Sequence, residues 1–165
     1  MIRGCLLDQR AYRAAAADEK GTNDAWLALG FVFLMTSIGP YLIYFTVPSV
    51  SQLISIVLMT GIQVAGMAAG AALISALSPS IAGVKVSFGQ VLRPLAYAQS
   101  IGVFGFLGMI ATVLGIWRIV TSLTAIRAVI GCDPVKAAVL LIIGGIGSIL
   151  AAMLLSPLVL TTQFF

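Results

Sequence analysis

The chain has 165 residues, of which 61% are hydrophobic and only 8% are charged, and it contains no histidine. A soluble domain carries about 25% charged residues, so this composition excludes a soluble globular protein and indicates helices that face lipid. The net charge of +4 comes from scattered basic residues rather than from a basic cluster. We therefore do not expect a nucleic acid as a partner.

Residues 1–22 differ from the rest of the chain because they hold most of its acidic and several of its basic residues. Their apolar content is too low and too short to span a bilayer. We expect an amphipathic helix over residues 2–16 that lies on the cytoplasmic surface of the membrane. Its apolar anchors are Ile2, Leu6 and Leu7.

Residues 23–165 are expected to form a transmembrane domain that begins with two long apolar segments. The first span runs from about Ala25 to Val47, with a kink predicted at Gly39-Pro40. The second span runs from about Val50 to Leu77, where Ser78-Pro79-Ser80 is expected to end it.

Three further spans follow. Ser87 is the expected cap of the third helix, and the chain is then apolar from Leu95 to Ile130 apart from two arginines. That length exceeds one span of about 20 residues, so we expect two spans with a turn near Gly105–Gly108. The fifth span runs from about Val135 to Leu155. The predicted fold is all-α: a polytopic integral membrane helix bundle with five transmembrane helices, preceded by the short surface helix.

The basic residues determine the predicted orientation, because cytoplasmic segments of membrane proteins are enriched in Lys and Arg. With the N-terminus inside, eight of the nine basic residues lie on the cytoplasmic side and none lies in an outer segment. The sequence therefore predicts a multi-pass protein of the bacterial cytoplasmic (inner) membrane with a cytoplasmic N-terminus.

Glycines at spacings of three and four mark candidate helix-packing faces on three of the predicted spans. Small residues at this spacing share one helix face and let neighbouring backbones approach closely in lipid. Such faces serve packing within the bundle or, as the alternative, self-association or contact with a partner helix. The glycines concerned are Gly66, Gly70, Gly108, Gly115, Gly144 and Gly147.

Arg118 is the one charged residue near the middle of a predicted span. An arginine there costs about 2.5–3.5 kcal/mol on insertion scales, and no acidic residue is placed inside the membrane to offset it. It shares a face with Gly115, so we expect it inside the bundle, with Gln99 as its first contact. Two interpretations stay open: snorkelling of the side chain toward the interface with a network of neutral hydrogen bonds, or an anionic lipid headgroup, ligand or partner acid as counter-ion. The candidate intramembrane polar site is Arg118, Gln99, Tyr97 and Gln63.

The segment from Val86 to Ala138 resembles the Yip-one domain (Ypt/Rab-interacting protein) family, and its small prokaryotic members in particular. The similarity lies in a helix start led by Phe88, in Tyr97-Ala98, in Trp117 in the fourth span, and in a glycine-containing turn before Lys136-Ala137. The resemblance implies five spans, a cytoplasmic N-terminus and a role in membrane organisation. Eukaryotic members carry a longer polar N-terminal region and associate with prenylated GTPases; this chain has only a short one.

Two classes of function remain after the sequence is considered. The leading hypothesis is a non-enzymatic, membrane-organising or accessory subunit of a membrane complex, which needs no metal or cofactor and whose partners are lipids and other membrane proteins or a second copy. The alternative is a small transporter or channel with a polar path around Arg118. An enzyme is not expected, because no nucleophile has a histidine or acid in reach. A dry, closed core favours the first class, and a polar cavity reaching Arg118 favours the second.

Overall fold

The computed structural model of the chain describes residues 8–106 and 111–157. Within these residues it consists of α-helices and two 3₁₀ helices. Four of the helical segments are long and apolar enough to cross a membrane. These are Glu19–Ile43, Val50–Ala82, Thr112–Ile130 and Pro134–Leu155.

The described elements lie close together in the sequence. In chain order they are α2 (Gln9–Ala17), the 3₁₀ helix η1 (Glu19–Gly21), α3 (Thr22–Ile43), α4 (Val50–Ala82), α5 (Phe88–Gln99), the 3₁₀ helix η2 (Ser100–Phe106), α6 (Ala111–Ile130) and α7 (Pro134–Leu155).

The helix starts are capped by side chains that the sequence places there. The hydroxyl groups of Ser49 and Ser87 each form a capping box with the glutamine three residues later, at the starts of α4 and α5. At the start of α7, Asp133 Oδ1 accepts hydrogen bonds from the backbone N–H groups of Val135 and Lys136 at 2.9 and 3.1 Å. These caps confirm the expected beginnings of the second, third and fifth helices.

The expected end of the second helix at Leu77 is wrong, because α4 continues to Ala82. Pro79 has no N–H group to donate to the carbonyl of Ser75 one turn earlier. The Ser78 hydroxyl donates to that carbonyl instead, at 3.0 Å. The helix therefore passes the proline and ends only at Gly83, whose φ of 74° is the left-handed conformation that glycine adopts at low cost.

The expected third span is not one continuous α-helix. The α-helix α5 ends at Gln99 after 12 residues, and the chain continues as the seven-residue 3₁₀ helix η2. By length alone α5 does not qualify as a span. The first two residues of the turn expected at Gly105–Gly108 belong to η2 instead, and the other two lie outside the described residues. Helix α3 ends at Ile43 rather than near Val47.

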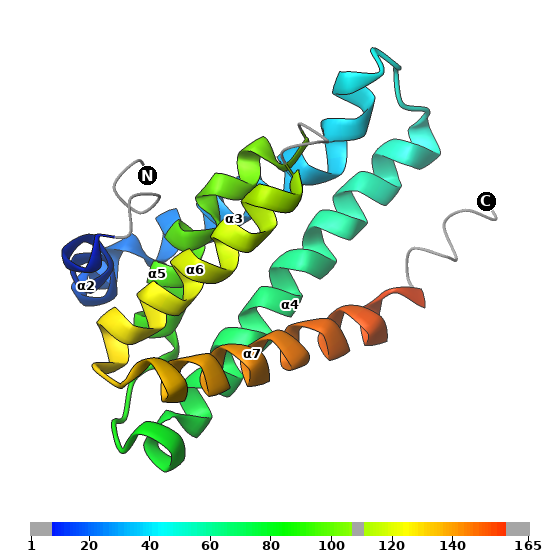
Figure 1. The fold of residues 1–165 in the computed structure, drawn as a ribbon. Coiled ribbons are helices and arrows are strands. Elements are labelled where there is room, and N and C mark those ends of the chain that lie inside the picture. Colours follow the sequence, from blue (N-terminus) through cyan, green and yellow to red (C-terminus); the bar gives the residue numbers. More distant parts are fainter. Residues whose placement is uncertain (1–7, 107–110, 158–165) are drawn as a thin grey trace.

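The helices form two groups, which Figure 1 shows side by side. Helices α3, α5 and α6 pack together with η2, while α4 packs most extensively against α7. Helix α2 lies across one end of the first group and contacts α5 and α6, with Tyr12 and Ala16 buried. The apolar anchors predicted for a surface helix, Ile2, Leu6 and Leu7, lie outside the described residues, and contact of this segment with lipid stays a prediction.

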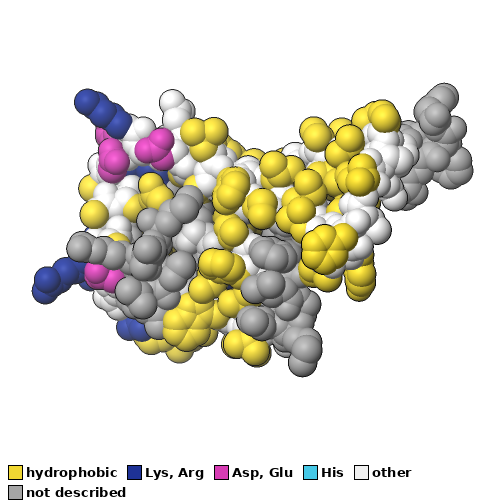
Figure 2. Space-filling model, turned by 90° about the horizontal axis from the view of Figure 1, so that it is seen from above, with side chains coloured by type: hydrophobic (Ala, Val, Ile, Leu, Met, Phe, Trp, Pro, Cys, Tyr) yellow, Lys and Arg dark blue, Asp and Glu magenta, His cyan; other side chains and the backbone are white. Residues whose placement is uncertain are grey.

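Charged side chains gather at one end of the described structure. Figure 2 shows the Lys, Arg, Asp and Glu side chains of the visible face at one extremity, while hydrophobic side chains cover much of the remaining visible surface. The same end holds α2, the start of α3, the end of α4 and the turn between α6 and α7. Large hydrophobic side chains such as Leu27, Val57, Ile116 and Leu154 are exposed on the helices, as expected for surfaces that face lipid.

Candidate functional site

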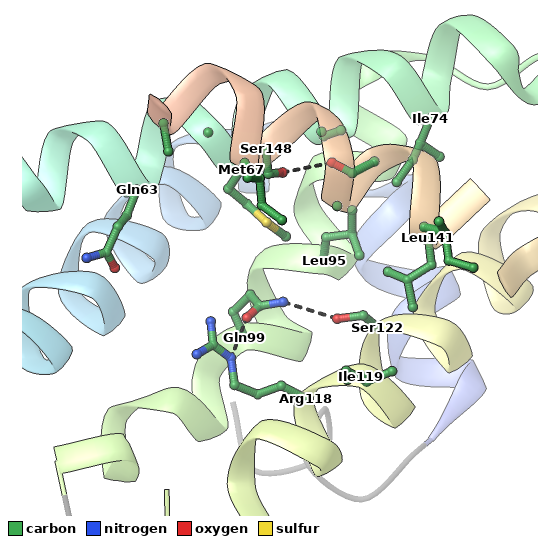
Figure 3. Close-up of a pocket in the computed structure, with 18 of the residues that line it drawn as sticks. Gln63, Met67, Ile74, Leu95, Gln99, Arg118, Ile119, Ser122, Leu141 and Ser148 are labelled. Carbon is green, nitrogen blue, oxygen red and sulfur yellow. Dashed lines mark hydrogen bonds between the residues drawn. The ribbon is translucent and has the colours of Figure 1, made fainter. Parts of the chain in front are cut away.

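A cleft of about 580 Å³ lies between the two helix groups. Its walls come from α4 and α7 on one side and from α5 and α6 on the other, with Phe33 of α3 also contributing (Figure 3). Most of the lining is apolar, from side chains such as Met67, Ile74, Leu95 and Ile149. The polar side chains that reach the cleft are Arg118, Gln99, Gln63, Ser122 and Ser148.

Arg118 and Gln99 form the polar centre of this cleft. Arg118 Nε donates a hydrogen bond to Gln99 Oε1 at 2.6 Å, and Gln99 Nε2 donates to the Ser122 hydroxyl at 3.1 Å (Figure 3). Gln99 and Ser122 are buried, so this chain of hydrogen bonds fixes which edge of the amide faces the arginine. The predicted contact between Arg118 and Gln99 is present, and it joins α6 to the end of α5.

Two further groups hold the guanidinium from α3 and η2. Arg118 Cζ lies 6.0 Å from the centre of the Phe33 ring, within the range of a cation–π interaction. A Cβ atom on Gly102 would lie 3.3 Å from Arg118 Cζ and 3.1 Å from Cγ1 of Val32. Gly102 therefore lets the guanidinium lie against the backbone of η2, a contact that the sequence did not predict.

The carbonyl of Gly102 also receives a bond from α3. The Thr36 hydroxyl lies 3.4 Å from that oxygen and 2.9 Å from the carbonyl of Val32. This contact ties η2 to the middle of α3 beside Arg118, and it gives the 3₁₀ segment a fixed place at the wall of the cleft. The signal in the sequence was only a threonine and a glycine 66 residues apart.

The other predicted members of the polar site are placed differently. Gln63 lines the cleft, with its Nε2 3.5 Å from the Ser37 hydroxyl. Tyr97 does not line the cleft; it is half-buried against the core cluster. Including Tyr97 in the site was therefore wrong, because it leaves α5 on a different face from Gln99, two residues later.

Four of the predicted packing glycines lie where α4 crosses α7. A Cβ atom on Gly66 would lie 2.9 Å from the carbonyl oxygen of Ser148, and one on Gly70 would lie 2.6 Å from that of Gly144. A Cβ on Gly144 would lie 2.6 Å from Cδ1 of Ile74, and one on Gly147 would meet the Leu73 side chain. These close approaches confirm the glycine faces of α4 and α7 as a packing surface within the bundle.

Gly115, which the sequence predicted as a packing glycine, does not lie at a contact between helices. A Cβ atom there would meet no atom within 4 Å, and the residue lines the cleft instead of a helix contact. Spacing had placed it correctly on the face of Arg118, but no neighbouring helix covers that part of the face. Gly108 lies outside the described residues.

Arg93 has a structural role that the sequence did not reveal. Its side chain is buried, with Nε 2.9 Å from the carbonyl of Gly89 and Nη1 2.9 Å from that of Ala16. It thereby caps the carboxyl end of α2, where the helix leaves carbonyl groups without partners. From the sequence, Arg93 was predicted only as one of the cytoplasmic basic residues.

Chemically, the cleft offers one fixed cation among apolar walls. The sequence has no Asp or Glu between Asp24 and Asp133, so no acid from the membrane-spanning segments neutralises Arg118. Among the described residues there is no group of three or more His, Cys, Asp or Glu that would hold a metal ion.

Comparison of the chain with protein-family models, with curated proteins and with solved structures found no match. The functional assignment below is therefore based on the fold and on the cleft.

Proposed function

We propose that the chain is a non-enzymatic integral protein of the bacterial inner membrane that organises the membrane or serves as an accessory or assembly subunit, in the manner of small Yip-type proteins. The observation that carries this proposal is the gathering of charged side chains at one end of a body whose helices are otherwise apolar outside (Figure 2). A bilayer accommodates such a body with the charged end in the cytoplasm.

The proposal includes five crossings. Helix α5 rises about 18 Å at 1.5 Å per residue, and η2 adds about 14 Å at 2.0 Å per residue. Together they reach about the 30 Å of a hydrocarbon core. The break at Gln99 lies against Arg118 and α3, so its polar backbone faces protein rather than lipid, where irregular backbone is tolerated.

Topology mapping tests this part of the proposal. A reporter enzyme that is active only outside the cytoplasm is fused after Lys85 or after Phe165. We expect the Lys85 fusion to be inactive and the C-terminal fusion to be active. Equal behaviour of the two fusions would contradict a chain that crosses the membrane three times between these positions.

The accessory role is tested by extracting the tagged chain with its surrounding lipid in polymer-bounded discs and measuring intact masses. We expect lipid or a membrane protein to remain with the chain in a fixed ratio. Recovery of a bare monomer under conditions that preserve another inner-membrane complex would oppose this role.

The second candidate function, a small transporter or channel, is favoured by one specific observation: the cleft reaches Arg118 and has Gln63 and Gln99 on its walls. Against a polar path, most of the lining is apolar. Flux of chloride or phosphate into sealed vesicles containing the purified chain, lost in Arg118→Leu, would favour the transporter. Vesicles as tight as protein-free controls would favour the accessory role.

A further inference from the structure

We propose that the cleft binds a long-chain fatty acid, with its carboxylate on Arg118 and its hydrocarbon chain along the walls formed by α4 and α7. The proposal rests on the proposed function in one respect: the chain must lie in a membrane. It adds a ligand class to the cleft, which an accessory role alone does not require.

The charge of the site calls for an anion. Arg118 keeps its proton under all ordinary conditions, and no Asp or Glu lies between Asp24 and Asp133. A second copy of this chain has the same sequence, so its spans bring no acid either. An anion that pairs with Arg118 within the membrane therefore comes from outside the spans of this chain and its copies.

The donor geometry suits a carboxylate. Arg118 Nε is occupied by Gln99 Oε1 at 2.6 Å, and the Ser122 hydroxyl holds that amide in place. The two Nη atoms at the other edge of the guanidinium carry the remaining N–H groups. A carboxylate accepts two parallel hydrogen bonds from such a pair. Gln63 on α4 and Arg118 on α6 reach the cleft from its two opposite walls (Figure 3).

The depth of the site selects a single-chain acid. Arg118 Cζ lies over the ring of Phe33, and Phe33 lies about 16 Å along α3 from Thr22 and about 15 Å from Ile43. The cation is thus near the middle of a helix long enough to cross the membrane. A fatty acid brings one carboxylate to this depth, whereas a two-chain phospholipid must also bring its ester groups and the rest of its headgroup out of water, which costs more.

The size and lining of the cleft fit a small, mostly apolar ligand that carries an acidic group. Its volume of about 580 Å³ falls within the range of about 300–1,000 Å³ of small-molecule sites, which are mostly apolar with a few placed polar groups.

The test uses the full chain in phosphatidylcholine vesicles, with stearate spin-labelled near its methyl end as the probe. Electron spin resonance reports the motionally restricted fraction of the probe, compared with phosphatidylcholine carrying the same label. At alkaline pH, where stearate is ionised, we expect stearate to be favoured about tenfold to hundredfold, as for hydrogen bonds to a charged group. The preference should disappear when the carboxylate is replaced by its methyl ester.

Two variants test the site by independent routes. Arg118→Leu removes the cation. Gly115→Leu places a side chain in the cleft from α6, where its Cβ meets no atom within 4 Å, and circular dichroism checks that the variant remains folded. The matched control is Gly61→Leu, since Gly61 is an exposed glycine of α4 outside the cleft and its added Cβ also meets nothing within 4 Å. We expect both cleft variants to lose the preference for stearate and Gly61→Leu to keep it.

The proposal is overturned by a wild-type chain that shows no preference for stearate, or by a preference that both cleft variants retain. It is also overturned if labelled phosphatidylglycerol is favoured over stearate, which would assign the site to a phospholipid headgroup. These outcomes leave the fusion-based topology intact, whereas failure of the proposed function shows first in the topology and intact-mass measurements.

Discussion

Gly70 of α4 offers the sharpest test of how the two helix groups are held, through the change Gly70→Ala. The added Cβ would lie 2.6 Å from the carbonyl oxygen of Gly144, whereas ordinary contact begins at about 3.4 Å. The Ser148 hydroxyl also lies in the way of this Cβ and can rotate aside, but the carbonyl oxygen of Gly144 is backbone and no side-chain rotation relieves that contact. Helices α4 and α7 must separate by about 0.8 Å at this point.

The magnitude follows from two opposing effects. A gap of about 0.5–1 Å forfeits a quarter to a half of the attraction between facing atoms, and overpacking costs about 1–3 kcal/mol. Alanine regains up to about 1 kcal/mol over glycine in helix propensity. We therefore expect Gly70→Ala to lower the free energy of unfolding by about 1–2 kcal/mol.

The assay is unfolding by titration with dodecyl sulfate in mixed micelles, followed by circular dichroism. The matched control is Gly115→Ala, which gains the same helix propensity but meets no atom within 4 Å; it should be neutral or slightly more stable. The reasoning is refuted if Gly70→Ala is as stable as the wild-type chain, or if Gly115→Ala loses as much.

Three further substitutions or reactions test local features. Arg93→Met removes the hydrogen bond to the carbonyl of Ala16 and should release α2, measured as faster exchange of the amide hydrogens of α2. The control variant Lys85→Met should leave that exchange unchanged, and equal exchange in the two variants would contradict the role of Arg93. Asp133→Ala should lower the free energy of unfolding by about 1 kcal/mol in the same titration, because it removes the cap of α7. Asp133→Asn keeps an oxygen acceptor and should change this free energy little. Equal losses of stability in the two variants would contradict the cap. Burial raises the pKa of the Cys132 thiol, so less of it is thiolate at neutral pH. Maleimide should therefore label Cys132 more slowly than an exposed cysteine, and the labelling rate should rise with pH. Labelling as fast as that of a free thiol would argue against this burial.

The parts of the fold that depend on local chemistry were predictable from the sequence. A serine or aspartate before an apolar run carries a cap within three residues of itself, so the starts of α4, α5 and α7 follow directly from Ser49, Ser87 and Asp133. The contact of Arg118 with Gln99 followed from the cost of a charge in lipid together with a short connection between neighbouring helices.

The parts that failed depend on partners distant in the chain. Periodicity placed Gly115 on the face of Arg118 but carried no information on whether another helix covers that face. The cap that Arg93 supplies to α2 joins residues 77 positions apart. Pro79 cannot donate to the carbonyl of Ser75, and the Ser78 hydroxyl donates to it instead. The helix therefore continues past a proline that usually marks a helix end.

The length of α4 has a consequence for the surrounding bilayer. Its apolar portion, from Leu53 to Leu77, measures about 37 Å at 1.5 Å per residue, against a hydrocarbon thickness of about 30 Å. Lying within that thickness requires a tilt of about 37°, near the upper limit observed for transmembrane helices. A thicker bilayer relaxes the tilt and a thinner one increases it. Since α4 packs against α7 through Gly66 and Gly70, we expect a change in bilayer thickness to tilt both helices together, and these two helices form one wall of the space beside Arg118.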